Sequence, residues 1–248
     1  MPTFRLTVAY DGTGFVGWQR QPSGTSIQGL LEDALGALDG REVVVTGAGR
    51  TDAGVHAIGQ VAGVSLERVI DGPTLARAVN ARLPEAVRVT EASEAPPAFH
   101  ARFNARSKTY RYRIWNGEVL SPFERAYVWH VAAPPLDVEA MARAALVFEG
   151  RHDFAAFQAA GSETRTTERT VSSSRVSRAP DAPLIICEIS GNGFLRHMVR
   201  NIAGTLAEVG RGHHPVAWVE EVLASRARAR AGPTAPPEGL FLVRVDYE

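Results

Sequence analysis

One short segment of the 248-residue sequence places a carboxylate and a guanidinium close together among glycines. It runs from Gly47 to His56 and contains Arg50 and Asp52. Glycine lets the backbone adopt positive φ angles and approach a ligand closely. The segment can therefore present Asp52 to a bound molecule. It can equally be a turn between two strands, because Asp-Ala-Gly is common turn chemistry.

Other chemistries for this segment fit the residues less well. It lacks the Gly-Lys-Ser/Thr ending of a P-loop and does not open a helix, which excludes that phosphate-binding loop. A glycosidase of the usual kind would need a second carboxylate as acid; the segment holds only Asp52, although a carboxylate distant in sequence could fold in beside it. A single carboxylate suits nucleophilic catalysis without a metal, provided that a cation such as Arg50 keeps it ionised.

The first half of the chain supplies strand and helix patterns on both sides of this segment. Thr25 and Gln28 have the spacing of a capping box, which predicts the start of a helix there. The expected strands cover residues 4–9, 43–45, 58–64 and 87–89, and the helices carry apolar residues from 27 to 38 and from 75 to 79.

The second half has a similar order of elements. We expect strands at residues 110–115, 171–176, 184–189 and 240–245, and helices at 138–148, at 196–209 and from 215 onward. Asp137 is the expected N-cap of the first helix, and Arg196 and Arg200 share one face of the second. The repeated order predicts an α+β fold of two βαββαβ halves, residues 1–104 and 105–248, whose sheets flank a central cleft.

Charge is unevenly distributed although the formal net charge is zero. Lys108 is the only lysine, and residues 100–113 hold five basic side chains and no acidic one. Phe103, Tyr110 and Tyr112 are interleaved with them. Arginine binds phosphate through a planar fork and stacks on bases, so this segment can bind nucleic acid. Taken alone, it is better explained as a solvated strand face with aromatic residues inside.

Other features limit the class of protein. No signal peptide is visible and no apolar run is long enough to cross a bilayer, so we expect a cytoplasmic protein without a membrane segment. Cys187 is the only cysteine, which excludes an intrachain disulfide and a Cys-rich zinc site. His213 and His214 have no cysteine or carboxylate partner nearby in sequence, so we expect a turn there and no metal.

The segment from Gly49 to His56 resembles the active-site signature of the tRNA pseudouridine synthase A family. Further stretches resemble motifs of that family in the same order along the chain. They are residues 10–12, 17–21, 80–84, 99–103, 110–112, 197–202 and 239–243.

The resemblance implies an isomerase that detaches the uracil of a uridine in RNA, rotates it and reattaches it through carbon. It implies that Asp52 is the nucleophile, attacking C6 of the base or C1′ of the sugar. Tyr110 would stack on the base, Arg50 would fill the vacated space or hold a phosphate, and Arg200 would pair with Asp52. Leu242 would pack beneath the uracil, although it could equally belong to the core.

The same resemblance implies a homodimer that binds tRNA and modifies uridines on the 3′ side of the anticodon stem-loop. No metal, cofactor or nucleotide energy source would be required. Arg20, Arg102, Arg106, Lys108 and Arg196 are the expected RNA contacts. Two alternatives remain: a non-catalytic module built from two RNA-recognition folds, and a hydrolytic nucleosidase that would release free uracil.

Overall fold

Alternation of apolar and polar residues produces the first strand, β1 (Thr3–Tyr10). Phe4, Leu6 and Val8 are fully buried, while Arg5 and Thr7 between them are partly exposed. This two-residue period is the pattern of a strand with one face against a core. The computed structural model describes residues 1–161 and 164–247.

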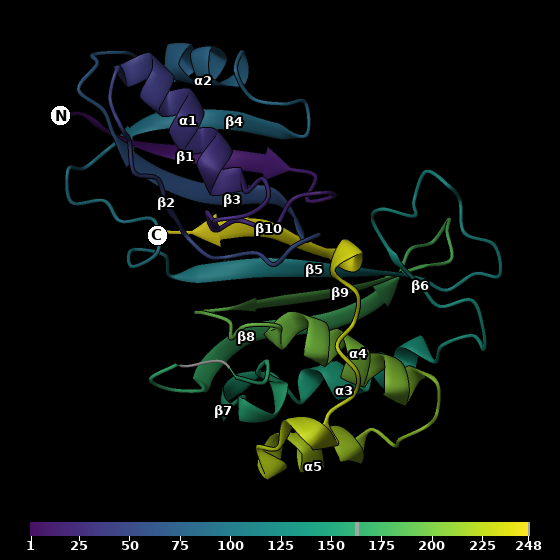
Figure 1. Cartoon of the computed structure of the whole chain (residues 1–248). Helices are drawn as coiled ribbons and strands as arrows, with labels where there is room; N and C mark the ends of the chain where they lie inside the picture. The colour runs from purple at the N-terminus through teal and green to yellow at the C-terminus, as the bar shows by residue number, and fades with distance from the viewer. Residues whose placement is uncertain (162–163, 248) are drawn as a thin grey trace. The chain divides into compact units, whose positions relative to one another are not determined.

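The chain divides into two units, each with its own strands and helices (Figure 1). Unit 1 comprises Met1–Arg106 and Phe241–Glu248, and unit 2 comprises Ser107–Leu240. The expected α+β class is confirmed.

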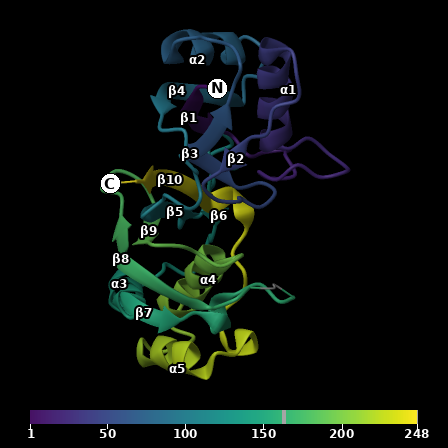
Figure 2. The same cartoon turned by 90° about the vertical axis from the view of Figure 1, so that its left-hand side faces the viewer.

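Unit 1 contains a sheet in the order β4-β1-β3-β10. Its elements are α1 (Ile27–Asp39), β2 (Thr46–Gly47), β3 (His56–Ser65), α2 (Gly72–Asn80), β4 (Val87–Ala95) and β10 (Leu240–Asp246). β1 is antiparallel to β3 and β4, and β2 is antiparallel to the far end of β3. β10 is parallel to β3, with Phe241 opposite His56 and Leu242 opposite Ala57. α1 and α2 contact each other over this unit's sheet (Figures 1 and 2).

Unit 2 contains four strands in the order β5-β9-β8-β7, each antiparallel to the next, and the short β6 pairs in parallel with β5. Its strands are β5 (Ser107–Trp115), β6 (Trp129–His130), β7 (Gly150–Asp153), β8 (Glu168–Arg178) and β9 (Leu184–Gly191). Its helices are α3 (Val138–Leu146), α4 (Met198–Gly210), α5 (Ala217–Ser225) and the 3₁₀ turns η1 (Ala155–Phe157), η2 (Arg228–Arg230) and η3 (Pro237–Gly239). α3 contacts β8 and α4, and α4 also contacts β5.

The two units share one pairing rule. In unit 1 the first strand, β1, pairs in an antiparallel way with β3. In unit 2 the first strand, β5, pairs in the same antiparallel way with β9. In a βαββαβ unit the first strand lies beside the third, and β1 lies beside β3 in this way, so the connectivity agrees with an internal duplication. Sequence order placed the last strand with the second half, whereas β10 pairs with β3 of unit 1.

The start of α1 corrects the predicted capping box. Ser26 is the N-cap, and its hydroxyl accepts a hydrogen bond from the Gly29 amide at 3.2 Å. Gln28 does not reach back to Thr25; its side-chain amide donates to Glu32 and to the Val45 carbonyl instead. The expected Asp137 cap of α3 is confirmed by a 2.9 Å hydrogen bond from the Ala140 amide.

Residues 43–45 do not form the predicted strand, although Val43 and Val45 point inward and Val44 is exposed. The Val45 amide donates to the Glu32 carboxylate at 3.2 Å, and its carbonyl accepts from Gln28. Side chains of α1 thus satisfy backbone groups that a strand would pair with another strand. The short strand β2 begins one residue later.

Candidate active site

Asp52 lies on the loop that joins β2 to β3 in unit 1. At the start of the loop the Ala48 amide donates to the Val61 carbonyl at 2.8 Å. At its end the Val55 amide donates to the Asp52 carbonyl at 3.1 Å, and Gly54 has a φ of 77°. Only glycine adopts that left-handed angle readily, so Gly54 allows the chain to reverse directly after Asp52.

Three buried polar side chains hold the loop on the N-terminal side of Asp52. The Tyr10 hydroxyl lies 2.8 Å from the Thr51 hydroxyl. The Gln60 amide donates to the Gly49 carbonyl at 2.8 Å and to the Tyr10 hydroxyl at 3.4 Å. Burial raises the pKa of Tyr10 to about 12, so its hydroxyl stays protonated at neutral pH. The cluster is therefore a network of neutral hydrogen bonds that fixes the residue before Asp52.

A second segment of unit 1 packs directly against the loop backbone. The Trp18 amide donates to the Thr51 carbonyl at 3.0 Å. A Cβ on Gly17 would lie 2.5 Å from that same carbonyl oxygen, and a Cβ on Gly12 would lie 2.1 Å from the Val55 carbonyl oxygen. Neither position can hold a side chain without moving the loop, so these two glycines permit the close backbone approach.

His56 fastens the other end of the loop. Its side chain is 1% exposed, and its Nδ1 lies 2.9 Å from the Gly12 amide, which donates to it. The same nitrogen lies 3.2 Å from an oxygen of Asp11. The ring stacks on Phe241 of β10, with 4.6 Å between centroids. His56 thereby links the loop to both the end of β1 and the start of β10.

These contacts leave a half-buried carboxylate on a backbone that is held on both sides. Arg50 is exposed and, within residues 1–161 and 164–247, forms no ion pair. A carboxylate at a fixed, accessible position can act as a nucleophile or as a general base.

The remaining unit 1 residues predicted from the sequence occupy different surroundings. Leu242 is fully buried and lies opposite Ala57, one residue after the loop ends at His56. Arg20 is exposed and forms ion pairs with Glu32 and Asp33 of α1, at 3.1 and 3.2 Å.

Unit 2 contains other residues that were predicted from the sequence. Tyr110 on β5 is 7% exposed, and its ring meets Phe194 edge-on with 5.0 Å between centroids. Lys108 lies two residues earlier on the same strand and is half-buried.

The segment that follows Phe194 leads to the two predicted arginines of α4. Arg200 is half-buried, and its Nε donates to the Ala235 carbonyl at 2.7 Å. α4 begins at Met198, after His197 in a left-handed conformation, so Arg196 precedes the helix. The prediction that Arg196 and Arg200 share a helical face is therefore wrong.

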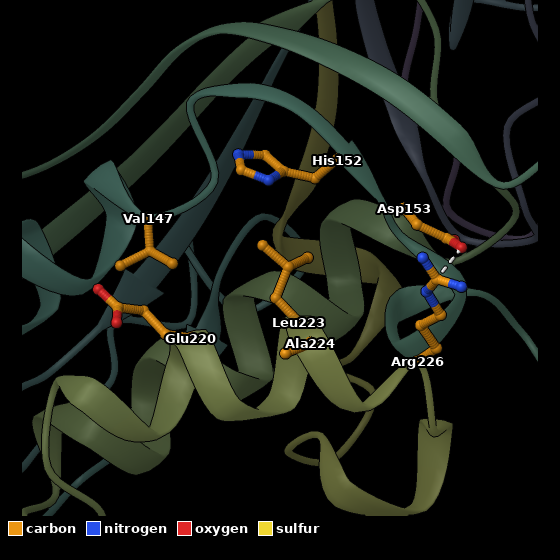
Figure 3. A pocket seen from close by; sticks show the side chains of 7 residues that line it. All are labelled: Val147, His152, Asp153, Glu220, Leu223, Ala224 and Arg226. Carbon is orange, nitrogen blue, oxygen red and sulfur yellow. Dashed lines mark ion pairs between the residues drawn. The ribbon is translucent and has the colours of Figure 1, made fainter.

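A wide cavity of about 580 Å³ lies elsewhere in unit 2 (Figure 3). β7 contributes His152 and Asp153, and the guanidinium of Arg226 lies 3.1 Å from Asp153 at its edge. Val147, Glu220, Leu223 and Ala224 complete its lining. None of the residues predicted from the sequence lines this cavity.

One of the two histidines after α4 contacts a carboxylate that lies five residues earlier in the sequence. His213 Nδ1 lies 2.7 Å from a carboxylate oxygen of Glu208, which Arg211 also contacts. The statement that these histidines lack a nearby carboxylate is thus wrong. In the described part of the chain no group of three or more His, Cys, Asp and Glu side chains could hold a metal ion.

The amino-acid sequence of the chain is similar to those of known proteins. The family described as "tRNA pseudouridine synthase" matches residues 6–104 and 144–248. A protein of Myxococcus xanthus named "tRNA pseudouridine synthase A" is 50% identical over 248 residues, which is 100% of this chain and 92% of that protein. The chain belongs to the tRNA pseudouridine synthase family.

A second relative of the same name, from Solibacter usitatus (strain Ellin6076), is 47% identical over 250 residues and covers 100% of both chains. The solved "archaeal box H/ACA sRNP Nop10-Cbf5 complex" contains a chain with 14% identity and a TM-score of 0.33, matched over 92% of this chain and 60% of that one. A TM-score this low carries no conclusion about fold or function.

Within this tRNA pseudouridine synthase family member, the loop network was not foreseen. The sequence singled out Asp52 and Arg50, but gave no role to Tyr10, Gln60 or His56. Their side chains meet the loop only because β1 and β3 pair along their length. The resemblance of residues 10–12 to a family motif was the one signal that could have pointed to the first of them. In the described residues no helix has the length and apolarity needed to span a membrane.

Proposed function

We propose that this chain converts uridine to pseudouridine in tRNA, with the Asp52 carboxylate as nucleophile. The observation that carries the proposal is the half-buried carboxylate on a loop held by the network of Tyr10, Thr51 and Gln60. A nucleophile needs such a fixed position, because misplacement by about 1 Å can cost two orders of magnitude in rate. Membership of the tRNA pseudouridine synthase family supports the reaction class.

The proposed reaction conserves every atom of the base and sugar except one exchangeable proton. Asp52 attacks either C6 of the uracil or C1′ of the ribose, and the bond between C1′ and N1 breaks. The base turns within the site, C5 bonds to C1′, and the bond to the Asp52 carboxylate breaks. N1 takes up a proton, and the hydrogen on C5 leaves as a proton. No oxidant, reductant or nucleotide is needed to balance this sequence. Water must be kept from the site while the base is detached.

The target uridine must leave its stack before Asp52 can reach it, at a cost of a few kcal/mol. We assign Arg50 to the flipped nucleotide, either in the vacated space or on its phosphate, since its guanidinium is exposed. The family resemblance assigns Tyr110 to the face of the base and Arg200 to the Asp52 carboxylate. It also assigns Leu242 to the underside of the uracil, and the complete burial of Leu242 supports an apolar packing role.

The proposed substrate region is the 3′ side of the anticodon stem-loop, and the proposed assembly is a homodimer in the cytoplasm. Arg102 and Arg106 are exposed and suit contacts with phosphates. We extend the contact set to Lys108, Arg196 and Arg20. Arg20 would have to exchange its ion pairs with α1 for the RNA, so its contribution is expected to be small.

Tritium release tests the reaction directly. Purified protein is incubated with tRNA transcribed with [5-³H]uridine, and both solvent tritium and free uracil are measured. Tritium in water without free uracil is the expected result, because only bond formation at C5 releases that label while retaining the base. Free uracil without tritium release would identify a nucleosidase, and binding without either product would identify a non-catalytic RNA module.

A further inference from the structure

An aromatic ring stands open to solvent on a short turn of unit 1. Phe103 is 75% exposed. The ring of His100 lies against it, with 4.2 Å between centroids, and the guanidinium carbon of Arg102 lies 5.7 Å from its centroid. These two neighbours support the ring and still leave most of it uncovered.

Hydrogen bonds fix the turn that carries Phe103. The Asn104 side chain accepts from the His100 amide at 2.6 Å, and the Asn104 amide donates to the His100 carbonyl at 3.0 Å. His100 Nδ1 accepts from the Arg102 and Phe103 amides at 3.2 and 3.3 Å. The Tyr247 hydroxyl also donates to the Ala101 carbonyl at 2.7 Å, which ties the turn to the end of β10. A ring held in this way loses little further entropy on binding.

The charge around the ring is positive. Residues 95–109 contain no aspartate or glutamate. Arg102 and Arg106 are exposed, and neither pairs with a carboxylate anywhere in residues 1–161 or 164–247. Arg20, in contrast, is neutralised by two carboxylates of α1. One guanidinium against an open aromatic face, with a second exposed arginine three residues after Phe103 on the turn's C-terminal side, matches the chemistry of single-stranded nucleic acid, which offers phosphates and base faces together.

We propose that Phe103 is a stacking platform for an unpaired base of the RNA substrate other than the target uridine, and that Arg102 and Arg106 hold the phosphates beside that base. The inference rests on the proposed function, because it takes the tRNA as the ligand. Phe103 would thereby recognise an unpaired segment of RNA whatever its sequence, since every base has an aromatic face.

Unit 2 offers a matched control residue. Phe123 is 87% exposed, but it lies next to Glu124, which forms an ion pair with Arg113 at 2.8 Å. Phe123 thus presents an exposed ring whose neighbour in sequence is an ion-paired glutamate, whereas the ring of Phe103 lies against an arginine. Replacing either phenylalanine with leucine keeps an apolar side chain and removes the aromatic face.

The experiment compares the full-length Phe103→Leu, Phe103→Trp and Phe123→Leu proteins with the unaltered chain. Affinity is measured for an unmodified tRNA transcript and for a fully paired RNA duplex, and melting and oligomeric state are recorded. Phe103→Leu should bind tRNA about 5- to 150-fold more weakly, the range that one stacked base contributes. Phe103→Trp should bind at least as well as the unaltered chain, and Phe123→Leu should bind equally well. Duplex affinity should not change in any of them.

Three outcomes would overturn the platform. They are unchanged tRNA affinity in Phe103→Leu, an equal loss for the duplex, and a change of oligomeric state that accounts for the loss. Tritium release by the unaltered chain is measured on the same preparation. Its absence would count against the proposed function, whereas normal release with unchanged Phe103→Leu affinity would remove the platform alone.

Discussion

The Tyr10 hydroxyl lies 2.8 Å from the Thr51 hydroxyl, so the last residue of β1 holds the residue that precedes Asp52. Tyr10 is 4% exposed and Thr51 is 7% exposed. A buried hydrogen bond of this kind constrains direction as well as position, because any rotation of the loop leaves two polar groups without partners. The orientation of Asp52 is therefore coupled to the pairing of β1 with β3.

Replacing Tyr10 with phenylalanine should separate this positioning role from folding. The change removes one hydroxyl and leaves the Thr51 hydroxyl and the Gln60 amide short of a partner, at a cost of roughly 1–3 kcal/mol. We expect a lower turnover rate with tRNA affinity little changed. Tyr112→Phe is the control, since that hydroxyl donates to the Pro236 carbonyl in unit 2. If both variants lose only stability, the Tyr10 contact has no special role in turnover.

Asp52→Asn should abolish chemistry while leaving the fold and tRNA binding intact. Asparagine keeps the size and turn preference of aspartate but is a far weaker nucleophile. Loss of a covalent route lowers the rate by about 10⁴-fold or more. An ordinary turn residue would cost at most about 1 kcal/mol of stability with normal turnover. Tritium release, melting and tRNA binding are measured together, and substantial turnover free of contaminating wild-type enzyme would exclude Asp52 as the nucleophile.

Tyr110 can be tested by removing the hydroxyl and the ring separately. If Tyr110 only stacks on the base, Tyr110→Phe should retain most activity and Tyr110→Leu should lose it. The edge-on contact with Phe194 should persist in the phenylalanine variant, so both units should melt as before. Equal inactivity of the two variants would indicate that the hydroxyl takes part in proton transfer.

Salt dependence tests the basic residues. Each phosphate contact adds roughly −0.7 to −0.9 to the slope of log K against log salt. Arg102→Glu combined with Arg106→Glu should weaken tRNA binding and flatten that slope. Arg143→Glu with Arg175→Glu, at two exposed arginines of unit 2, should leave the slope nearly unchanged. An identical slope in both double variants would place Arg102 and Arg106 outside the RNA interface.

The carboxylate of Glu208 predicts a pH-dependent contribution to stability. Burial acts to raise the pKa of Glu208, but hydrogen bonds from His213 and Arg211 outweigh it and lower the pKa below the ordinary value of 4.5. Stability from a lowered carboxyl pKa is present above the unfolded value and disappears as the pH falls through the folded value. Glu208→Gln should thus cost about 1 kcal/mol or less at pH 7, and the difference should vanish in acid. Denaturant unfolding at several pH values measures this, with the exposed Glu118→Gln as control; a constant difference would contradict it.

Much of the architecture follows from local patterns, and each wrong prediction has an identifiable physical cause. The strands beginning at Thr3 and Ser107 were predicted because alternation of apolar residues is a property of a single strand. The strand expected at residues 43–45 failed because Gln28 and Glu32 take its backbone hydrogen bonds, and those contacts come from another element. Ser26 replaced Thr25 as N-cap because adjacent hydroxyl residues offer nearly the same capping chemistry.

The residues of the candidate site could likewise be predicted from the sequence only in part. Asp52 could be proposed as the nucleophile because its loop is rich in glycine and resembles a family signature. The residues that hold it could not, because Tyr10 and Gln60 reach the loop only through the register of β1 with β3. His213 and Glu208 are five residues apart, and only the turn after α4 brings them into contact.

The parallel pairing of β10 with β3 has a consequence for synthesis on the ribosome. Phe241, which covers the ring of His56, is translated long after the loop that contains Asp52. At 5–20 residues per second the delay is on the order of ten seconds. During that time the nascent unit 1 has an open edge of β3 beside the loop that carries Asp52. The loop thus gains the support of Phe241 only after β10 has been translated, so nascent chains that stop before Phe241 would hold Asp52 on a loop without this contact.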